Sequence, residues 1–508
     1  MAGNRWLWCF MIMFLVVQAG ISDNIDQIEL EEAVLPVAPS AVPGLTALVP
    51  FAVLDDREVA GGIAVFGFQP GVDIVPGKDD FFIVSYAQEG GWINPGRATI
   101  YKFDKNGNKL AGPVTTRDNS ESFGISKGWH IAAFSDGGCV AVGGSRFGLG
   151  TEDGLDLSVI DREVSGYRIF DATLKPLTAL KSVWEPANQP GNDDRDPDVD
   201  QRALVERLSN DRFVVVLSMQ SVNMQLQFGL TDNGNTPAGK IVYRVFEKDG
   251  TPVGPSRWAF PVSDENGGWD SSQSNPDVVA GPDGTFAIIA VIPGLLANGD
   301  PYPLQFFDNN GERVGEPFGV VDQTLIDEGT IVQPGIISPK LGYGDGVYVS
   351  GVNIKLVGLN TNTFGVTVFG QDKKIIRSTY DGLRHKDNLP EVREGDLTSD
   401  PSGNFFVVDR SDQAFDGSAD ADKIQFMQMH TRDGKPFGPS FITFPPDDSI
   451  GSQRDPAVDA NANIFVVASL NEGVPGDVNT LSGVNTLAVY ANPMPQTQTA
   501  IHSWMLMN

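Results

Sequence analysis

The chain has 508 residues, of which 65 are acidic and 36 are Lys or Arg, so its formal net charge at pH 7 is -29. A surface this negative repels phosphate backbones and anionic lipid, which disfavours nucleic acid and membrane surfaces as partners and makes divalent cations suitable ligands. The 57 glycines, 34 prolines and only two cysteines predict many turns and short strands that rest on an apolar core rather than on disulfides.

The N-terminal segment has the pattern of a secretory signal. A single basic residue, Arg5, precedes an apolar run from Trp6 to Val17, and Ala19 ends a tripeptide that suits signal peptidase. We therefore expect residues 1–19 to be removed and the protein to be extracellular or periplasmic, with no membrane span after cleavage. The alternative is an uncleaved anchor, but the run is shorter than the about 20 residues that span a bilayer.

Residues 20–57 are rich in Pro, Ala and acidic side chains and show no sustained hydrophobic period. This composition predicts a flexible lead-in. A short helix over residues 25–33 is the alternative.

From residue 58 to residue 508 the chain repeats. A strongly apolar strand of about six residues recurs seven times, at steps of 58 to 74 residues. Its copies begin at Phe81, Cys139, Phe213, Phe286, Val347, Phe405 and Ile464.

A second signature alternates with the first. It is an aromatic-rich strand followed by a turn of the Asp-Gly or Asn-Gly type, which tolerates the positive φ angles of a tight hairpin. The clear copies begin at Asp104, Glu247, Asp308 and Thr431.

Two hairpins in each unit give four strands. Polar and apolar residues alternate too weakly along the apolar strand for one of its faces to be exposed to water. Each small sheet must therefore be covered on both faces, and seven sheets packed radially achieve this. We predict an all-β protein, a seven-bladed β-propeller of four-stranded antiparallel sheets over residues 58–508. Residues 58–68 are expected to supply the strand that closes the ring. An open β-solenoid or a pair of β-sandwiches would not repeat in this way.

The repeats resemble those of secreted bacterial β-propeller proteins, in which a P-x-V-A-x-x-x-D-G-x-F-V-V unit alternates with an F-D-x-x-G-x-x-x-G unit. The resemblance covers roughly residues 71–503 and implies the fold but no activity, because propellers host many unrelated functions.

The mouth of the axial channel is the expected binding site of such a fold. Counting back roughly nine residues from each apolar strand leads to a set of residues expected near that mouth: Asp73, His130, Leu204, Asp277, Lys340, Asp396 and Ala457. The polar members, above all Asp73, His130, Asp277 and Asp396, are predicted to bind a ligand by coordinating a cation or engaging hydroxyl groups. The alternative is that they are solvated strand ends or turn caps.

Tryptophans and acidic runs extend this prediction. Trp92, Trp184 and Trp269 lie in segments expected on the same face, beside Asn, Asp, Glu or Gly, a combination that suits stacking on a sugar ring. The alternative is that they staple long loops. The run that contains Asp194, Asp196 and Asp198 offers oxygen donors to calcium, although a solvated acidic loop explains it as well.

Motifs for nucleophilic or zinc-dependent catalysis are missing from the sequence. We expect an exported, monomeric, non-enzymatic binding module for a glycan or protein partner. The alternative is an extracellular carbohydrate-active hydrolase or lyase that uses a pair of carboxylates in the funnel. A purely structural surface component is a third reading. Two of Asp73, Asp277 and Asp396 facing one another across an open funnel would favour the enzyme.

Overall fold

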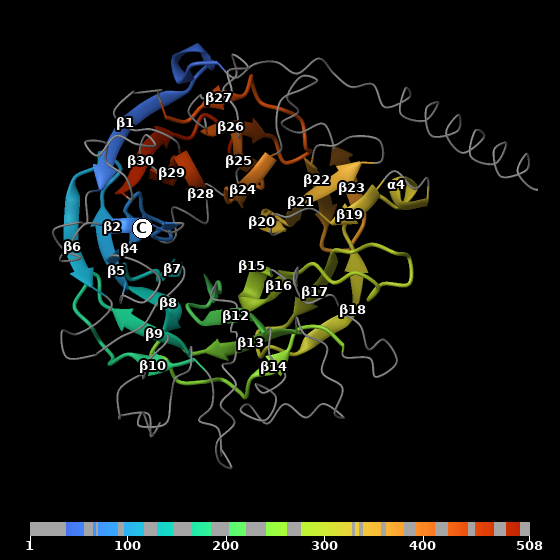
Figure 1. The fold of residues 1–508 in the computed structure, drawn as a ribbon, viewed down its shortest axis with the longest axis horizontal. Coiled ribbons are helices and arrows are strands. Elements are labelled where there is room, and N and C mark those ends of the chain that lie inside the picture. Colours follow the sequence, from blue (N-terminus) through green and yellow to red (C-terminus); the bar gives the residue numbers. More distant parts are fainter. Residues whose placement is uncertain are drawn as a thin grey trace, which may run out of the picture.

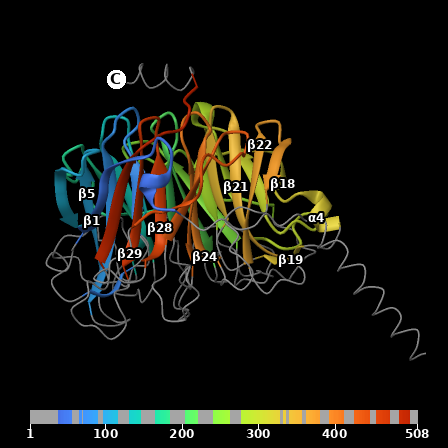
Figure 2. The same cartoon turned by 90° about the horizontal axis from the view of Figure 1, so that it is seen from above.

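The computed structural model describes residues 37–54, 64–67, 70–89, 96–115, 130–145, 164–183, 203–219, 240–261, 276–327, 331–334, 339–356, 362–379, 392–411, 425–444, 453–471 and 484–497. Seven small antiparallel sheets stand in a ring around a central opening (Figure 1). Figure 2 shows the same strands side by side across the thickness of the disc. The predicted seven-bladed β-propeller is thereby confirmed.

The blades are numbered here in chain order of their inner strands, with strands running from the axis outward. Blade 1 holds β2 (Ala64–Gly67), β3 (Gly71–Ile74), β4 (Phe81–Glu89), β5 (Gly96–Phe103) and β6 (Lys109–Thr115). Blade 2 holds β7 (His130–Ala133), β8 (Cys139–Ser145), β9 (Val164–Phe170) and β10 (Lys181–Ser182). Blade 3 holds β11 (Leu204–Arg207), β12 (Phe213–Met219), β13 (Lys240–Phe246) and β14 (Arg257–Trp258). Blade 4 holds β15 (Asp277–Ala280), β16 (Phe286–Ile289), β17 (Pro303–Phe307) and β18 (Arg313–Gly319).

The remaining blades complete the ring. Blade 5 holds β19 (Ile331–Pro334), β20 (Lys340–Gly344), β21 (Val347–Leu356), β22 (Asn362–Gly370) and β23 (Ile375–Thr379). Blade 6 holds β24 (Val392–Ser399), β25 (Phe405–Ser411), β26 (Gln425–His430) and β27 (Phe441–Ile442). Blade 7 holds β28 (Gln453–Ala460), β29 (Ile464–Asn471), β30 (Val484–Ala491) and, outermost, β1 (Thr46–Leu54).

In every blade, the apolar strand that pairs with the inner strand begins at the residue that the sequence predicted, from Phe81 in β4 to Ile464 in β29. These strands are apolar because neighbouring blades cover both of their faces. Phe213 to Leu217 in β12, for example, have no exposed surface at all. Burying one such side chain contributes roughly 1.5–3 kcal/mol.

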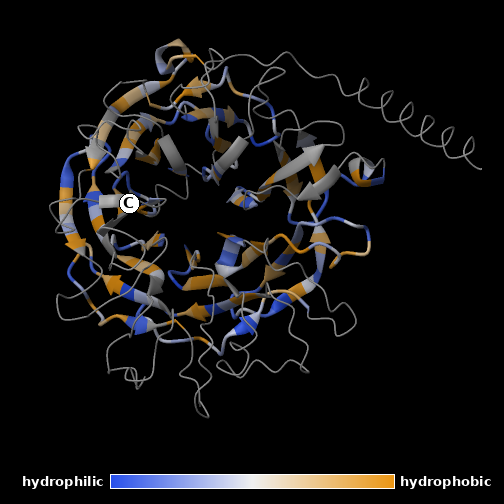
Figure 3. Ribbon diagram, viewed as in Figure 1, coloured by the Kyte–Doolittle hydropathy of each residue, from blue (hydrophilic) through white to orange (hydrophobic). Residues whose placement is uncertain are grey.

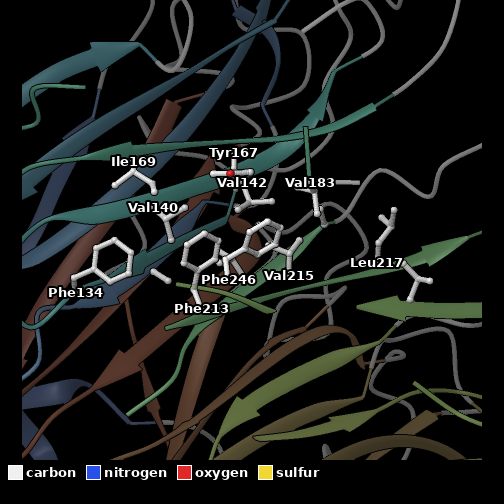
Figure 4. Close-up of a cluster of buried hydrophobic side chains, with 14 residues drawn as sticks. Phe134, Val140, Val142, Tyr167, Ile169, Val183, Phe213, Val215, Leu217 and Phe246 are labelled. Atoms are coloured by element: carbon white, nitrogen blue, oxygen red, sulfur yellow. The ribbon is translucent and has the colours of Figure 1, made fainter. Parts of the chain in front are cut away.

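The core is a series of walls between neighbouring blades rather than one central mass. In the wall between blades 2 and 3, Phe134 and Val142 pack against Phe213, Val215 and Phe246 (Figure 4). Figure 3 shows apolar residues along the strands of the blades and hydrophilic inner ends on β15 and β20. Hydrophilic residues therefore lie at the axis as well as on the outer strands.

Tight turns join the third and fourth strands, as predicted from the Asp-Gly and Asn-Gly pairs. Gly107, Gly250, Gly311 and Gly434 have φ angles of +76°, +84°, +76° and +81°. In the first of these turns, Asp104 Oδ1 accepts hydrogen bonds from the backbone N–H groups of Asn106 and Asn108 at 2.9 and 2.8 Å. The glycine supplies a conformation that other residues rarely adopt, and the aspartate fixes the loop around it.

The ring is closed by a different segment from the one expected. Strand β1 pairs with β30 of blade 7, although residues 46–54 belong to the predicted flexible lead-in. The predicted closing strand, residues 58–68, instead contributes β2, which pairs with β4 of blade 1. Pro50 suggested a linker, but an outermost strand tolerates proline, and the register of β1 shifts between Val49 and Ala52 around it.

Helical structure in the described ranges is confined to α4 (Gln323–Asp327) and to the 3₁₀ turns η1 (Pro39–Ala41) and η5 (Pro282–Gly284). Among these described residues, no helix has both the length and the apolar character needed to cross a membrane.

Candidate functional site

A central cavity of about 500 Å³ lies at the axis of the ring. All seven inner strands that surround it contribute to its lining, and each contacts the inner strand of the next blade, including β28 with β3. We call this cavity and its lining the funnel.

The funnel brings together the residues predicted from the sequence. Asp73, His130, Asp277 and Asp396 all line it, each from a different blade. Leu204, Lys340 and Ala457, the other positions of the predicted ring, line it as well. Their proximity is a structural fact, whereas ligand binding by them stays a prediction.

Two acidic residues that line the funnel were not predicted from the sequence. Glu206 on β11 and Asp459 on β28 line the cavity two residues after Leu204 and Ala457. Side chains two apart on a strand point to the same side, so this periodicity could have found them. Counting back to a single position per strand overlooked it.

Five funnel carboxylates share one structural role, which we call the clasp. Each accepts a hydrogen bond from a backbone N–H group on the inner strand of the next blade. The five bonds are Ala133 N to Asp73 at 2.7 Å, Ala280 N to Glu206 at 3.2 Å, Leu341 N to Asp277 at 2.7 Å, Val458 N to Asp396 at 2.9 Å and Ile74 N to Asp459 at 2.6 Å. A hydrogen bond contributes about 0.5–1.5 kcal/mol to a neutral carboxyl group and about 1.5–3 kcal/mol to an ionised one, so the clasps join neighbouring blades while fixing each carboxyl group in place.

Lys340 neutralises one side of the funnel. Its Nζ lies 3.0 Å from Asp396 Oδ1, and both side chains are largely buried. Burial and the nearby Asp396 raise the pKa of Asp277 to about 6, and the Lys340 charge opposes that rise. We call Asp277, Lys340 and Asp396 the lysine arc. Its two carboxylates lie near one another, but with an ammonium group beside them.

The opposite side of the funnel holds three acids: Asp459, Asp73 and Glu206. Burial, followed by repulsion from Asp459 and Glu206, raises the pKa of Asp73 well above its ordinary value. Burial also raises the pKa of Glu206 to about 8 and that of Asp459. We call these three residues the seam arc, because Asp459 and Asp73 flank the junction between blades 7 and 1 and Glu206, on β11 of blade 3, interacts electrostatically with both. The neighbouring Arg207 lowers the pKa of both Asp73 and Glu206, but not enough to cancel the rise.

The remaining predicted site residues lie outside the described residues. These are the tryptophans Trp92, Trp184 and Trp269 and the proposed calcium ligands Asp194, Asp196 and Asp198. Within the ranges that the structure does describe, no group of three or more His, Cys, Asp or Glu side chains is placed to hold a metal ion.

The chain was compared with known proteins. No protein-family model matches it, and no curated protein sequence matches it. Among solved structures, a protein of unknown function from Dyadobacter fermentans is 11% identical over 89% of this chain and 100% of that one, with a TM-score of 0.45. An ulvan lyase of a polysaccharide lyase family is 10% identical over 86% and 95%, with a TM-score of 0.41. A sialidase from Streptococcus pneumoniae is 11% identical over 87% and 70%, with a TM-score of 0.42. Likenesses this weak say nothing about the activity of this chain.

Proposed function

We propose that the protein is an exported, non-enzymatic binding module whose funnel takes a neutral or amino sugar, such as the end of a glycan chain. The observation that carries the proposal is the row of carboxylates held in place by the clasps around a cavity of about 500 Å³. Pockets for small ligands have volumes of about 300–1,000 Å³. Fixed carboxylate oxygens accept hydrogen bonds from hydroxyl and ammonium groups, while Lys340 and a protonated Glu206 can donate them.

The charge of the chain supports a neutral or cationic ligand rather than a polyanion, because an anionic polymer would be repelled by a net charge of -29. A concave funnel also suits a small polar group better than the broad surface of a protein partner. Export, proposed from the N-terminal signal pattern, would place the funnel where glycans are accessible.

The clasps favour binding over catalysis. A carboxylate that acts as a general acid or base changes its protonation state in every turnover. In this funnel the same carboxylates join blade to blade, so each change of charge would disturb a contact that supports the ring.

A glycan array probed with the mature protein tests the proposal, and Leu204→Trp is the informative variant. Leu204 lines the funnel and is absent from the clasps, so an indole there would block the cavity without breaking the ring. Binding should fall about tenfold or more, a loss of about 1.4 kcal/mol per tenfold. The matched control is Leu177→Trp, on an outer-rim residue that is 62% exposed, which should bind as the parent does. An array without hits, or equal binding by both variants, would contradict a funnel site for glycans.

Trp92, Trp184 and Trp269 remain part of the proposal as stacking residues for the same ligand. Aromatic pairs contribute about 0.5–1.5 kcal/mol beyond their buried area. By analogy, replacing one tryptophan with alanine should weaken binding several-fold. If a triple alanine variant binds like the parent, these residues only hold their loops in place.

A second candidate function has one observation in its favour. Glu206, with a pKa of about 8, and Asp459, which accepts three hydrogen bonds, would be the unequal acid pair that glycoside hydrolysis requires. Release of reducing sugar, or of an unsaturated product, from a glycan found on the array would reveal such activity. Glu206→Gln should then abolish turnover and leave binding intact. Absence of product with every bound glycan would reject the enzyme.

A further inference from the structure

The junction between blades 7 and 1, here called the seam, joins segments that are nearly 400 residues apart in the chain. On its inner side, Asp459 Oδ2 accepts a hydrogen bond of 2.6 Å from the backbone N–H of Ile74, across a separation of 385 residues. The contacts of β28 with β3 make this the place where the ring closes at the axis.

Asp459 is held from three blades. In addition to Ile74 of blade 1, its Oδ1 accepts from the backbone N–H of Ala460 in blade 7 at 2.8 Å. The same Oδ1 accepts from Thr398 Oγ1 of blade 6 at 3.3 Å. Three donors stabilise the ionised form of this carboxylate, despite its burial.

Asp73 precedes Ile74 on β3, so its carboxyl group lies beside that of Asp459 in the funnel lining, and a side-chain hydrogen bond with Asp73 lowers the pKa of Asp459 against the effect of burial. Two carboxyl groups can share a hydrogen bond only if one of them carries a proton. Asp73 accepts a hydrogen bond from Ala133 N at 2.7 Å, whereas Asp459 accepts three hydrogen bonds from other residues. The proton therefore resides on Asp73, which donates to the ionised Asp459.

The other titratable groups around this pair do not replace the proton. Glu206 repels both members, and its neighbour Arg207 attracts Asp73 but lies 3.7 Å from Asp211, an acid of its own blade. The titratable groups that line the funnel around the pair are His130 on β7, Glu206 and Arg207 on β11, Asp277 on β15, Lys340 and Tyr343 on β20, Asp345 in the turn after β20 and Asp396 on β24, while Lys78, Asp79 and Asp80 follow at the far end of β3. Lys340, the only lysine of the lining, is engaged with Asp396.

We propose that the Asp73–Asp459 pair is a proton-operated clasp that closes the propeller ring at the seam, and that loss of its proton loosens blade 1 from blade 7. The clasp holds while Asp73 can donate to Asp459. Without the proton, two carboxylates face one another in the funnel wall with Glu206 beside them, and separation of β3 from β28 relieves the repulsion.

The direction of the pH effect follows from linkage. Asp73 has a higher pKa in the closed ring than in an opened seam, so the closed ring binds more protons. The stabilisation by the clasp is complete below the ordinary pKa of an aspartate and is lost as the pH rises through the raised pKa of Asp73. The seam is therefore held more firmly in acidic than in alkaline surroundings.

Hydrogen exchange measured by mass spectrometry on the ligand-free mature protein tests the clasp. Exchange rates at pH 6 and pH 9 are first corrected for the intrinsic effect of pH on amide exchange. Protection of the peptide that contains β3, with Ile74, should fall about tenfold more than that of the peptide with β20, where Leu341 binds Asp277, because each unit of pKa difference changes an equilibrium tenfold. Equal loss of protection in the two peptides would overturn the proposal.

Two isosteric variants separate the proton from the contact. In Asp73→Asn, the amide keeps an acceptor for Ala133 and a permanent donor for Asp459, so β3 should stay protected at both pH values. In Asp459→Asn only one acceptor oxygen remains, so the amide NH2 must face either the N–H of Ile74 or the donors of Ala460 and Thr398, and β3 should be poorly protected at both pH values. Asp277→Asn, which removes a carboxylate from the lysine arc, should leave the pH dependence of β3 as in the parent. If Asp73→Asn keeps that dependence, the clasp is wrong.

Because no ligand enters these measurements, their outcome is independent of the proposed glycan binding. A failure of Asp459→Asn to fold leaves the parent, Asp73→Asn and Asp277→Asn to decide.

Discussion

The lysine arc and the seam arc solve the same structural problem in two ways. Both use carboxylates on inner strands to bind the backbone of the next blade, with N–H to O distances of 2.6 to 3.2 Å. In the lysine arc a permanent cation, Lys340, offsets the buried negative charge, whereas in the seam arc a proton does so. The pKa of Asp277 rises only to about 6, but that of Glu206 rises to about 8.

The comparison teaches that blade closure can be constant or adjustable with nearly the same side chains. The ammonium group of Lys340 opposes the rise in the pKa of Asp277, so the lysine arc depends less on a proton than the seam arc does. A shared proton leaves as the pH rises, so the seam arc weakens.

Removing the cation of the lysine arc should have the largest effect. Lys340→Met leaves Asp277 and Asp396 together in a largely buried site without a counter-charge. Breaking a buried ion pair costs about 3–5 kcal/mol, so the free energy of unfolding at pH 7 should fall by that order. Urea denaturation measures the loss.

The loss should shrink toward pH 4, because protonation of Asp277, whose pKa burial raises to about 6, removes its buried negative charge. The matched control is Lys374→Met, which breaks an exposed pair with Asp372 and should not change the urea midpoint. A similar loss in both variants would mean that Lys340 has no special role in the funnel.

The seam arc should respond to removal of Glu206, whose carboxyl group burial makes harder to ionise. The folded-state pKa of Glu206 is raised to about 8, so its favourable contribution is complete below its ordinary pKa and is lost as the pH rises through 8. Glu206→Gln removes the ionisable group, and with it the loss of stability at high pH, while the amide oxygen can keep the hydrogen bond from the backbone N–H of Ala280.

We expect Glu206→Gln to match the parent near pH 4 and to exceed its unfolding free energy by about 1–2 kcal/mol at pH 9. Denaturation at both pH values checks this. A variant that is less stable than the parent at pH 9 would show that Glu206 is ionised and well compensated in the funnel.

A lysine transplanted into the seam arc should make it resemble the lysine arc. Leu204 occupies on β11 the ring position that Lys340 occupies on β20, and it lines the same cavity. In Leu204→Lys the new ammonium group should lower the pKa of Glu206, which amounts to about 1.4 kcal/mol of stability at high pH for each pKa unit.

The stability profile of Leu204→Lys between pH 6 and pH 9 should therefore be flatter than that of the parent. Leu204→Met, of similar length but uncharged, is the control and should keep the slope. A slope that is unchanged by the lysine would place the pH dependence outside the funnel.

Much of the fold could be predicted because burial on both faces leaves a plain signal. The strand that begins at Phe213 is apolar without alternation, and only radial packing of repeated sheets covers it twice. The closing strand β1 was missed because a proline-containing edge strand and a linker have the same composition. Its place in blade 7 depends on contacts with β30, which local sequence does not encode.

The site could be predicted in part, for a similar reason. Counting back along the sequence from each apolar strand led to Asp73 and Asp396. This worked because the inner strand and the apolar strand form one hairpin, so their spacing in the sequence is nearly constant. Glu206 and Asp459 needed the two-residue period of the strand. The clasps were beyond the sequence, because a bond such as that from Ile74 to Asp459 depends on how two blades approach across the seam.

The smallest change is expected from a residue in the wall between blades, and it isolates the funnel's contribution to the pH profile. His430 is buried and stacks on Phe405 with ring centroids 4.7 Å apart, in the cross-strand place where Phe307 stacks on Phe286 in blade 4. Burial lowers the pKa of His430 to about 4. The folded state therefore binds fewer protons there, and the stabilisation that is present above pH 6.5 is lost as the pH falls through 4.

His430→Phe keeps the stacking and cannot be protonated. It should therefore have the same free energy of unfolding as the parent at pH 8, within about 0.5 kcal/mol, and resist acid better below pH 5. The alkaline weakening that we assign to the seam arc should be the same in both proteins. If His430→Phe also removed that alkaline slope, the contrast between the two arcs would not be its cause.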